Sequence, residues 1–67
     1  MNVIVTHLDR GWHVQLAGQV QPSFHLSGAD AFDAACRLAE AFHRRTGGCA
    51  TVDVRSFQAR VEVARFG

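Results

Sequence analysis

Hydrophobic and polar residues alternate over two neighbouring segments near the start of the chain, Asn2 to Leu8 and Trp12 to Ala17. A period of two, together with β-branched residues, indicates strands. Between them, Asp9-Arg10-Gly11 fits a three-residue hairpin loop with glycine at the left-handed position. The first twenty residues therefore predict an antiparallel β-hairpin.

That loop sets which side chains share a face of the hairpin, because side chains alternate strictly along a strand. On the face expected to form the core, the opposed pairs are Leu8 and Trp12, Thr6 and Val14, and Ile4 and Leu16. On the other face they are His7 and His13, and Val5 and Gln15. We therefore expect the indole to be covered and the imidazoles to face water.

The alternation resumes from Val20 to Leu26, with Phe24 on the parity expected to face the core. Pro22 lies in this segment. Because proline has no backbone N–H to donate to a ladder, this third strand should lie at a sheet edge or at a bulge.

A helix is predicted from about Ala29 to Arg45. Ser27 begins a capping box that has Asp30 in place of glutamate, and Gly47-Gly48 supplies the helix end. The charged residues with helical spacing, which should form a solvent stripe, are Asp33, Arg37, Glu40 and Arg44. The opposite, sheet-facing stripe is Ala31, Ala35, Leu38 and Phe42, flanked by Phe32 and Ala39.

Alternation returns from Ala50 to Arg55 and from Arg60 to Phe66, which predicts two strands joined by a turn near Ser56 to Ala59. One long bulged strand is an alternative, since no Asn-Gly or Asp-Gly pair marks the turn. The predicted fold is α+β: an open antiparallel sheet of four or five strands, in the order β-β-β-α-β-β, with one helix on one face.

The length of 67 residues fits a single domain, residues 1–67, near the lower limit for independent folding. Seven arginines and six acidic residues give a net charge of +1, too small to indicate nucleic acid, membrane or acidic substrates. No apolar run is long enough for a secretion signal or a membrane span, so a cytoplasmic location is expected. Cys36 and Cys49 are too few for a disulfide framework or a zinc knuckle, and we expect reduced thiols without an activated nucleophile.

Several motifs resemble a small bacterial family catalogued only as a domain of unknown function. They are Gly11-Trp12-His13-Val14, Phe24 before Ser27, Asp30 to Ala35 with Leu38-Ala39, Gly47-Gly48, Ala59-Arg60-Val61 and Phe66-Gly67. The resemblance implies a fold and no activity, and the chain departs from the family at Ala59, where a glycine is usual, and at Phe66, where a tyrosine is usual. A weaker likeness is to the RNase-H-like domain of HicB-type antitoxins, which begins with a similar hairpin and continues into an Ala-rich helix.

Three histidines would share the uncovered face of the predicted sheet: His7, His13 and His25, with Ser23 in the same row. Neutral imidazoles suit zinc, copper or nickel, but no carboxylate or cysteine joins them here. Half-exposed strand residues are the simpler interpretation, so we assign no metal, no cofactor and no catalytic residue.

The residues that would form a basic patch for nucleic acid are Arg44, Arg45, Arg55, Arg60 and Arg65. Phe57 and Phe66 are the aromatic candidates for stacking on bases. Asp53 and Glu62 dilute this positive field, so an ordinary solvated surface is the simpler interpretation.

Val3, Val5 and Ala17 on the uncovered face, and the wide apolar arc of the helix, favour association with another surface. The alternative interpretation is that Val3 and Val5 are ordinary strand valines that are partly exposed. We therefore predict a non-enzymatic interaction module, in the form of a homodimer joined by a sheet face or a strand edge. The alternative is a small nucleic-acid-binding or antitoxin-like regulator, and metal binding through the three histidines is a third hypothesis.

Overall fold

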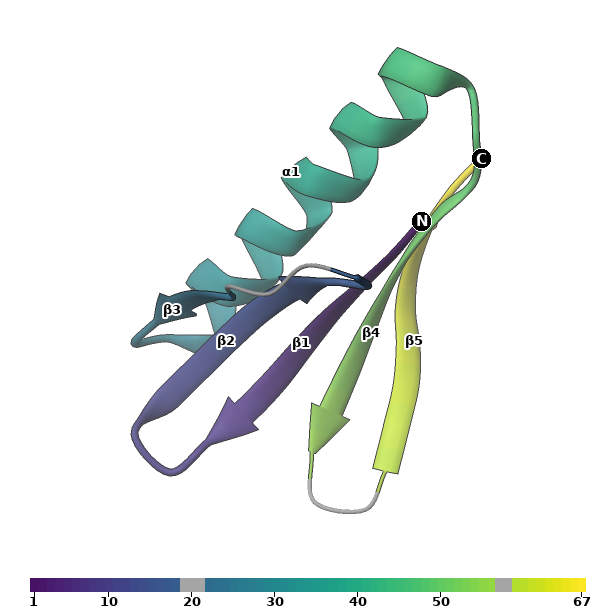
Figure 1. Cartoon of the computed structure of the whole chain (residues 1–67). Helices are drawn as coiled ribbons and strands as arrows, with labels where there is room; N and C mark the ends of the chain where they lie inside the picture. Colours follow the sequence, from purple (N-terminus) through teal and green to yellow (C-terminus); the bar gives the residue numbers. More distant parts are fainter. Residues whose placement is uncertain (19–21, 57–58) are drawn as a thin grey trace.

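The computed structural model describes residues 1–18, 22–56 and 59–67. Within them lie one helix and five strands: β1 (Asn2–Leu8), β2 (Gly11–Leu16), β3 (Ser23–His25), α1 (Gly28–Thr46), β4 (Ala50–Ser56) and β5 (Ala59–Phe66). Figure 1 shows α1 lying across one face of the sheet. The predicted α+β class and element order are confirmed. The alternative prediction of one long C-terminal strand is wrong, because β4 and β5 are two strands that pair antiparallel.

The sheet is mixed, with the order β3-β2-β1-β4-β5. The expectation of a purely antiparallel sheet is corrected at one pairing, since β1 and β4 run parallel. The reason is the crossover: α1 returns the chain to the end of the sheet where β1 begins, so β4 enters beside β1 in the same direction (Figure 1). The backbone N–H of Thr51 donates to the Met1 carbonyl at 2.9 Å, which joins the starts of these two strands.

The third strand is at an edge of the sheet, as predicted from Pro22. It is shorter than expected and keeps only Ser23–His25. Positions 20 and 21, which were predicted to belong to it, lie outside the described residues. The turn expected at 56–59 includes residues 57 and 58, which also lie outside them.

The register predicted for the first hairpin is wrong by one residue. The loop is the two residues Asp9 and Arg10, so Val5 pairs with Val14 and His7 pairs with Trp12. A slip of one residue moves every β1 side chain to the other face. The prediction that Trp12, Val14 and Leu16 face α1 is confirmed. The prediction that Leu8 and Phe24 also face α1 is wrong, because both side chains point away from it.

The role of Gly11 accounts for this error. Gly11 was assigned to the loop from the sequence, but it is the first residue of β2, and the close passage of β3 requires a glycine there. A Cβ at Gly11 would lie 2.6 Å from the His25 carbonyl oxygen and 2.7 Å from a ring carbon of Phe24. Gly11 therefore belongs to β2, where β3 crosses too close for a side chain.

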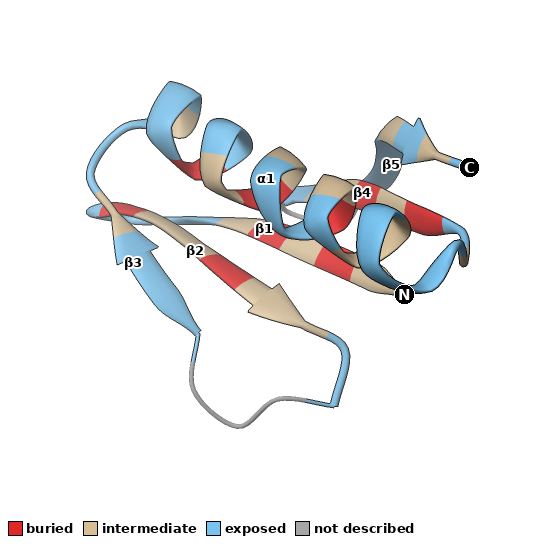
Figure 2. Cartoon of the chain, turned by 90° about the horizontal axis from the view of Figure 1, so that it is seen from above, coloured by how far each residue is buried: buried red, intermediate tan, exposed pale blue. Residues whose placement is uncertain are grey.

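The core between α1 and the sheet consists of small side chains. Among the described residues, the buried hydrophobic ones are Val3, Val5, Val14, Val52, Ala31, Ala35, Ala39 and Ala50 (Figure 2). Three alanines at intervals of four residues form the helix contact, and small side chains let the helix lie close to the sheet. Phe32 and Leu38, expected in or beside this contact, are each 40% exposed, while Phe42 packs at its border.

The helix ends and its charged stripe are confirmed. The Asp30 backbone N–H donates to Ser27 Oγ at 3.0 Å, and Gly47 ends the helix with a φ of 73° in the left-handed region. Asp33 pairs with Arg37 at 3.0 Å, and Glu40 pairs with Arg44, both four residues apart.

Candidate functional site

The sheet face opposite α1, called here the open face, has no element of the described chain over it (Figure 2). The strand registers place the following residues on it: Ile4, Thr6, Leu8, His13, Gln15, Phe24, Thr51, Asp53, Arg55, Arg60, Glu62 and Arg65. Its β1 to β3 half mixes apolar and polar groups, and its β4 and β5 half is charged. Val3 and Val5, which were expected on this face, are in the core instead.

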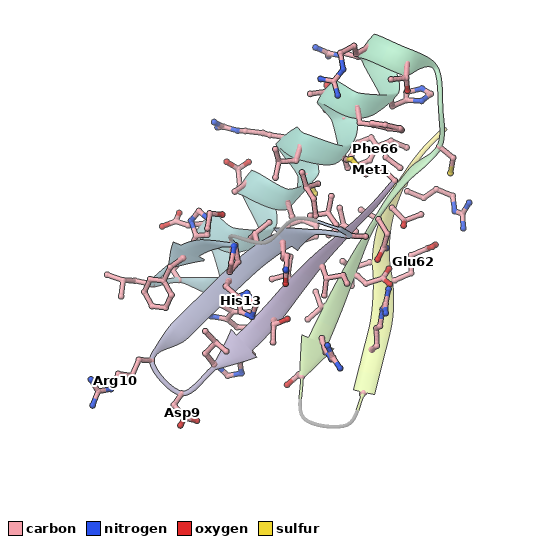
Figure 3. All side chains as sticks on the ribbon, viewed as in Figure 1. Met1, Asp9, Arg10, His13, Glu62 and Phe66 are labelled. Atoms are coloured by element: carbon pink, nitrogen blue, oxygen red, sulfur yellow. The ribbon has the colours of Figure 1, made fainter. Side chains whose placement is uncertain are left out.

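The predicted row of three histidines is wrong. His13 lies on the open face between Thr6 and Phe24 (Figure 3). His7 and His25 lie on the α1 side, separated by Trp12, which is the cross-strand partner of both. Over the described ranges, no group of three or more His, Cys, Asp or Glu side chains is arranged to hold a metal ion.

The Trp12 indole is held between two elements on the α1 side. The His7 ring stacks on it with ring centroids 4.2 Å apart and an angle of 16° between the planes. On the helix side, a Cβ at Gly28 would lie 2.9 Å from the indole. The indole therefore ties the β1–β2 hairpin to the first turn of α1.

Ser23 and His25 form a contact that the sequence reasoning did not single out. Ser23 Oγ and His25 Nε2 are 3.0 Å apart, in a 510 Å³ pocket that Asp30 and Asp33 also line. A serine nucleophile needs a base that is oriented by a third group. No hydrogen bond in the described chain joins His25 to either aspartate, so the arrangement lacks that group. The sequence indicates this contact only through the alternation pattern, which places Ser23 and His25 on the same face of a strand.

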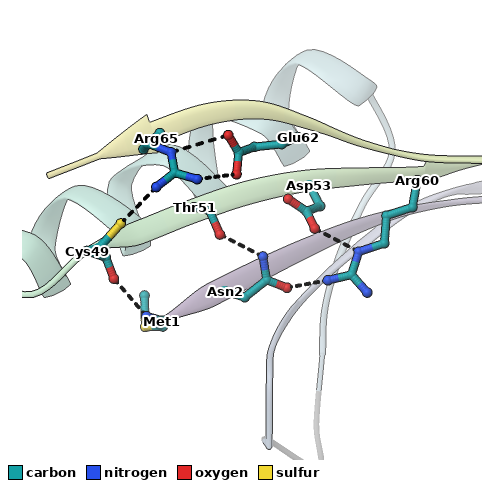
Figure 4. Close-up of polar contacts among 8 residues, drawn as sticks. All are labelled: Met1, Asn2, Cys49, Thr51, Asp53, Arg60, Glu62 and Arg65. Atoms are coloured by element: carbon teal, nitrogen blue, oxygen red, sulfur yellow. Dashed lines mark hydrogen bonds and ion pairs between the residues drawn. The ribbon is translucent and has the colours of Figure 1, made fainter.

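Three of the five candidate arginines, Arg55, Arg60 and Arg65, lie on the open face. Figure 4 shows Arg60 and Arg65 with their partners. Arg60 donates to Asp53 Oδ2 and to Asn2 Oδ1, each at 2.7 Å. Arg65 donates to Glu62 at 3.1 Å, and this hydrogen bond raises the pKa of Arg65. The side chain of Arg55 makes no hydrogen bond or ion pair with the described part of the chain, while its backbone belongs to β4.

The other two candidate arginines lie elsewhere. Arg44 pairs with Glu40 on the exposed side of α1, where Arg45 lines the same shallow pocket. The five arginines therefore do not form one patch. Of the aromatic candidates, Phe66 packs against the core, and position 57 lies outside the described residues.

The two cysteines differ in surroundings. Burial raises the pKa of the half-buried Cys36 thiol, and the nearby carboxylates of Asp33 and Glu40 act in the same direction. Cys49 is exposed, and its Sγ accepts from Arg65 Nη1 at 3.5 Å. The raised pKa of Cys36 disfavours a thiolate nucleophile at neutral pH.

The two edges of the sheet differ in length. β3 has three residues and directly follows Pro22, whereas β5 has eight residues and forms the opposite edge. Val61 and Val63 on β5 are 56% and 44% exposed.

No helix in the described ranges is long and apolar enough to cross a membrane.

The chain matches no protein-family model, no curated protein and no solved structure. The comparisons therefore assign no function to it.

Proposed function

We propose that this protein is a non-enzymatic interaction module that pairs with a second copy of itself along the outer edge of β5. The observation that carries this proposal is the length of that edge: eight residues end the sheet, and no described strand lies outside them. The unpaired N–H and C=O groups of a long edge strand are a template for another strand. The short β3, preceded by Pro22, is a poor template by comparison.

The small core also supports the proposal. The buried hydrophobic residues of the described chain are four valines and four alanines. A chain of about 60 residues buries only roughly 60% of the surface of its unfolded form, so additional burial stabilises it. Val61 and Val63 are exposed on the edge strand that a second copy would cover.

Charge complementarity selects one register for this pairing. Glu62 and Arg65 lie three residues apart and form an ion pair within one chain. When two copies of β5 pair antiparallel about a two-fold axis, the register that places Glu62 opposite Arg65 of the second copy also satisfies the reciprocal pair. The same surface is then complementary to itself.

Charge reversal tests this register. We expect wild-type protein to shift from monomer to dimer with rising concentration in analytical ultracentrifugation. Glu62→Arg alone and Arg65→Glu alone should stay monomeric because each creates two like-charge contacts across the axis. An equimolar mixture of the two variants should dimerise again. These side chains are exposed, so the variants should keep the fold, which circular dichroism checks.

Leu26→Lys is the matched control, because Leu26 is 82% exposed and lies beside β3 at the other edge. This variant should dimerise like the wild type. A wild-type protein that stays monomeric throughout, or single variants that dimerise as well as the wild type, would contradict the proposal.

The second candidate function is a small nucleic-acid-binding or antitoxin-like regulator. It is supported by Arg55 and Arg60, which are cross-strand neighbours on the open face. Retention of DNA or RNA at about 50 mM salt that is lost by about 200 mM would support it, because phosphate contacts release counterions. Absence of binding at the lower salt concentration would remove it.

A further inference from the structure

The parallel pair β1 and β4 creates a special position at one end of the sheet. After Leu8 the chain turns toward β2, and after Ser56 it leads to β5 on the opposite side. In open α/β sheets, ligands bind outside the carboxyl ends of parallel strands where the connections leave in opposite directions, and the ends of β1 and β4 share that divergence although both lead into antiparallel strands. Figure 1 shows the tips of β1 and β4 pointing the same way and diverging.

A pocket of 460 Å³ lies at this position and is lined by Thr6, His7, Leu8, Asp9, Arg55 and Ser56. Thr6 and Arg55 are cross-strand partners and approach it from the open face. His7 and Ser56 have the opposite parity and approach it from the α1 side. Both faces of the sheet therefore contribute hydrogen-bond donors to a single pocket.

These donors are not used elsewhere in the described chain. The side chains of Thr6, Arg55 and Ser56 make no hydrogen bond there, and His7 makes only its ring contact with Trp12. Hydroxyl and guanidinium groups around a pocket are free to turn toward a bound ligand. The pocket thus offers one positive charge and several polar hydrogens, beside the carboxylate of Asp9.

Arg55 is also distinguished by its electrostatic surroundings. The arginines that pair with a carboxylate are Arg37, Arg44, Arg60 and Arg65. The residue directly opposite Arg55 on β5 is Arg60, and like charges opposite one another are unfavourable. Arg60 is itself paired with Asp53, so an anion beside Arg55 would supply the negatively charged partner that Arg55 lacks.

We propose that this pocket binds the phosphate group of a small phosphate monoester. The guanidinium of Arg55 can donate two parallel hydrogen bonds to phosphate oxygens, and the Thr6 and Ser56 hydroxyls can donate to the others. Asp9 is the one carboxylate among the lining residues, and it opposes the ligand. A phosphate diester of a nucleic-acid backbone shares this chemistry but carries a single charge.

Chemical-shift titration at low ionic strength tests the proposal, with methyl phosphate as the monoester and dimethyl phosphate as the diester. Methyl phosphate should give saturable shifts at the amides of Thr6, Arg55 and Ser56. Arg55→Gln should weaken binding about tenfold or more, because the hydrogen bonds from the charged guanidinium to the phosphate are lost. Asp9→Asn should strengthen it.

Arg45→Gln is the matched control, because Arg45 is also exposed and without a partner in the described chain, but lies on α1. It should leave methyl phosphate binding unchanged. An absence of saturable shifts overturns the proposal, and so does an equal loss in the two arginine variants. A diester that binds as tightly as the monoester overturns the assignment to monoesters. None of these outcomes depends on the pairing of β5.

Discussion

At the scale of single residues, close approach and burial account for the positions with the strongest constraints. Gly11 is needed because β3 passes within 2.6 Å of where its Cβ would be, and Gly28 because the Trp12 indole fills the same kind of space. The His7–Trp12 stack shows that an imidazole on the α1 side has a packing role. These contacts join residues up to 16 positions apart in the sequence (Trp12 to Gly28).

Gly11→Ala should destabilise the protein by about 1–3 kcal/mol, because the added methyl group overlaps the backbone of β3. Gly18→Ala is a useful comparison, since a Cβ at Gly18 meets no atom within 4 Å and its cost comes only from its φ of 89°. Urea denaturation measures both. Equal effects of the two substitutions would contradict the close approach of β3.

Cys36 should react with iodoacetamide more slowly than Cys49 at pH 8. The Cys36 thiol is half-buried whereas Cys49 is exposed, and burial also raises the pKa of Cys36 above the ordinary value of 9.0. Rates measured in Cys49→Ser and Cys36→Ser variants separate the two thiols, and they should become equal in strong denaturant.

The same pKa shift predicts how stability depends on pH. Because the folded state keeps the Cys36 thiol protonated, its contribution is complete below pH 9.0 and is lost as the pH rises further. Urea titrations of the Cys49→Ser variant on both sides of pH 9.0 measure the loss. A stability that rises above that pH, relative to a variant lacking both cysteines, would contradict the shift.

At the scale of the elements, α1 and β1 depend on different kinds of information. The helix is determined locally, by the Ser27 cap, the alanine stripe and the left-handed Gly47. Local alternation predicts the length of β1 correctly, but the face to which each β1 side chain points depends on the two-residue loop before Gly11. Local pattern therefore predicts the helix well and predicts the strand without its register.

Two single substitutions at neighbouring β1 positions test that register. Val5→Thr should cost about 1–3 kcal/mol, because Val5 is 1% exposed and an unpaired hydroxyl would be buried there. Thr6→Val should have little effect, because Thr6 lies on the open face. Thermal denaturation of the two variants gives the comparison, and the opposite ranking would restore the register with a three-residue loop.

At the scale of the whole molecule, the parallel pairing of β1 with β4 makes β1 the central strand. It has β2 on one side and β4 on the other, and α1 covers its inner face (Figure 2). The edge strands β3 and β5 contain no buried residue in the described chain. Stability should therefore decrease from the middle of the sheet toward both edges.

Amide hydrogen exchange should follow this order. We expect the amides of β1 and the first half of β4 to exchange slowest and those of Ser23–His25 fastest, because local opening requires breaking fewer contacts at a short edge. Exchange followed by NMR at low protein concentration provides the measurement. Protection of β3 equal to that of β1 would be inconsistent with this topology.

Alternation, helix caps and proline placement were enough to predict the element order, the ends of α1 and the edge position of β3, because these features depend on residues close in the chain. The histidine row and the position of Val3 and Val5 were predicted incorrectly. Each of them depends on a strand register, which a single residue in a loop changes. The pocket beside Arg55 had no local signal at all, since it exists only where the crossover through α1 brings the end of β4 next to the end of β1.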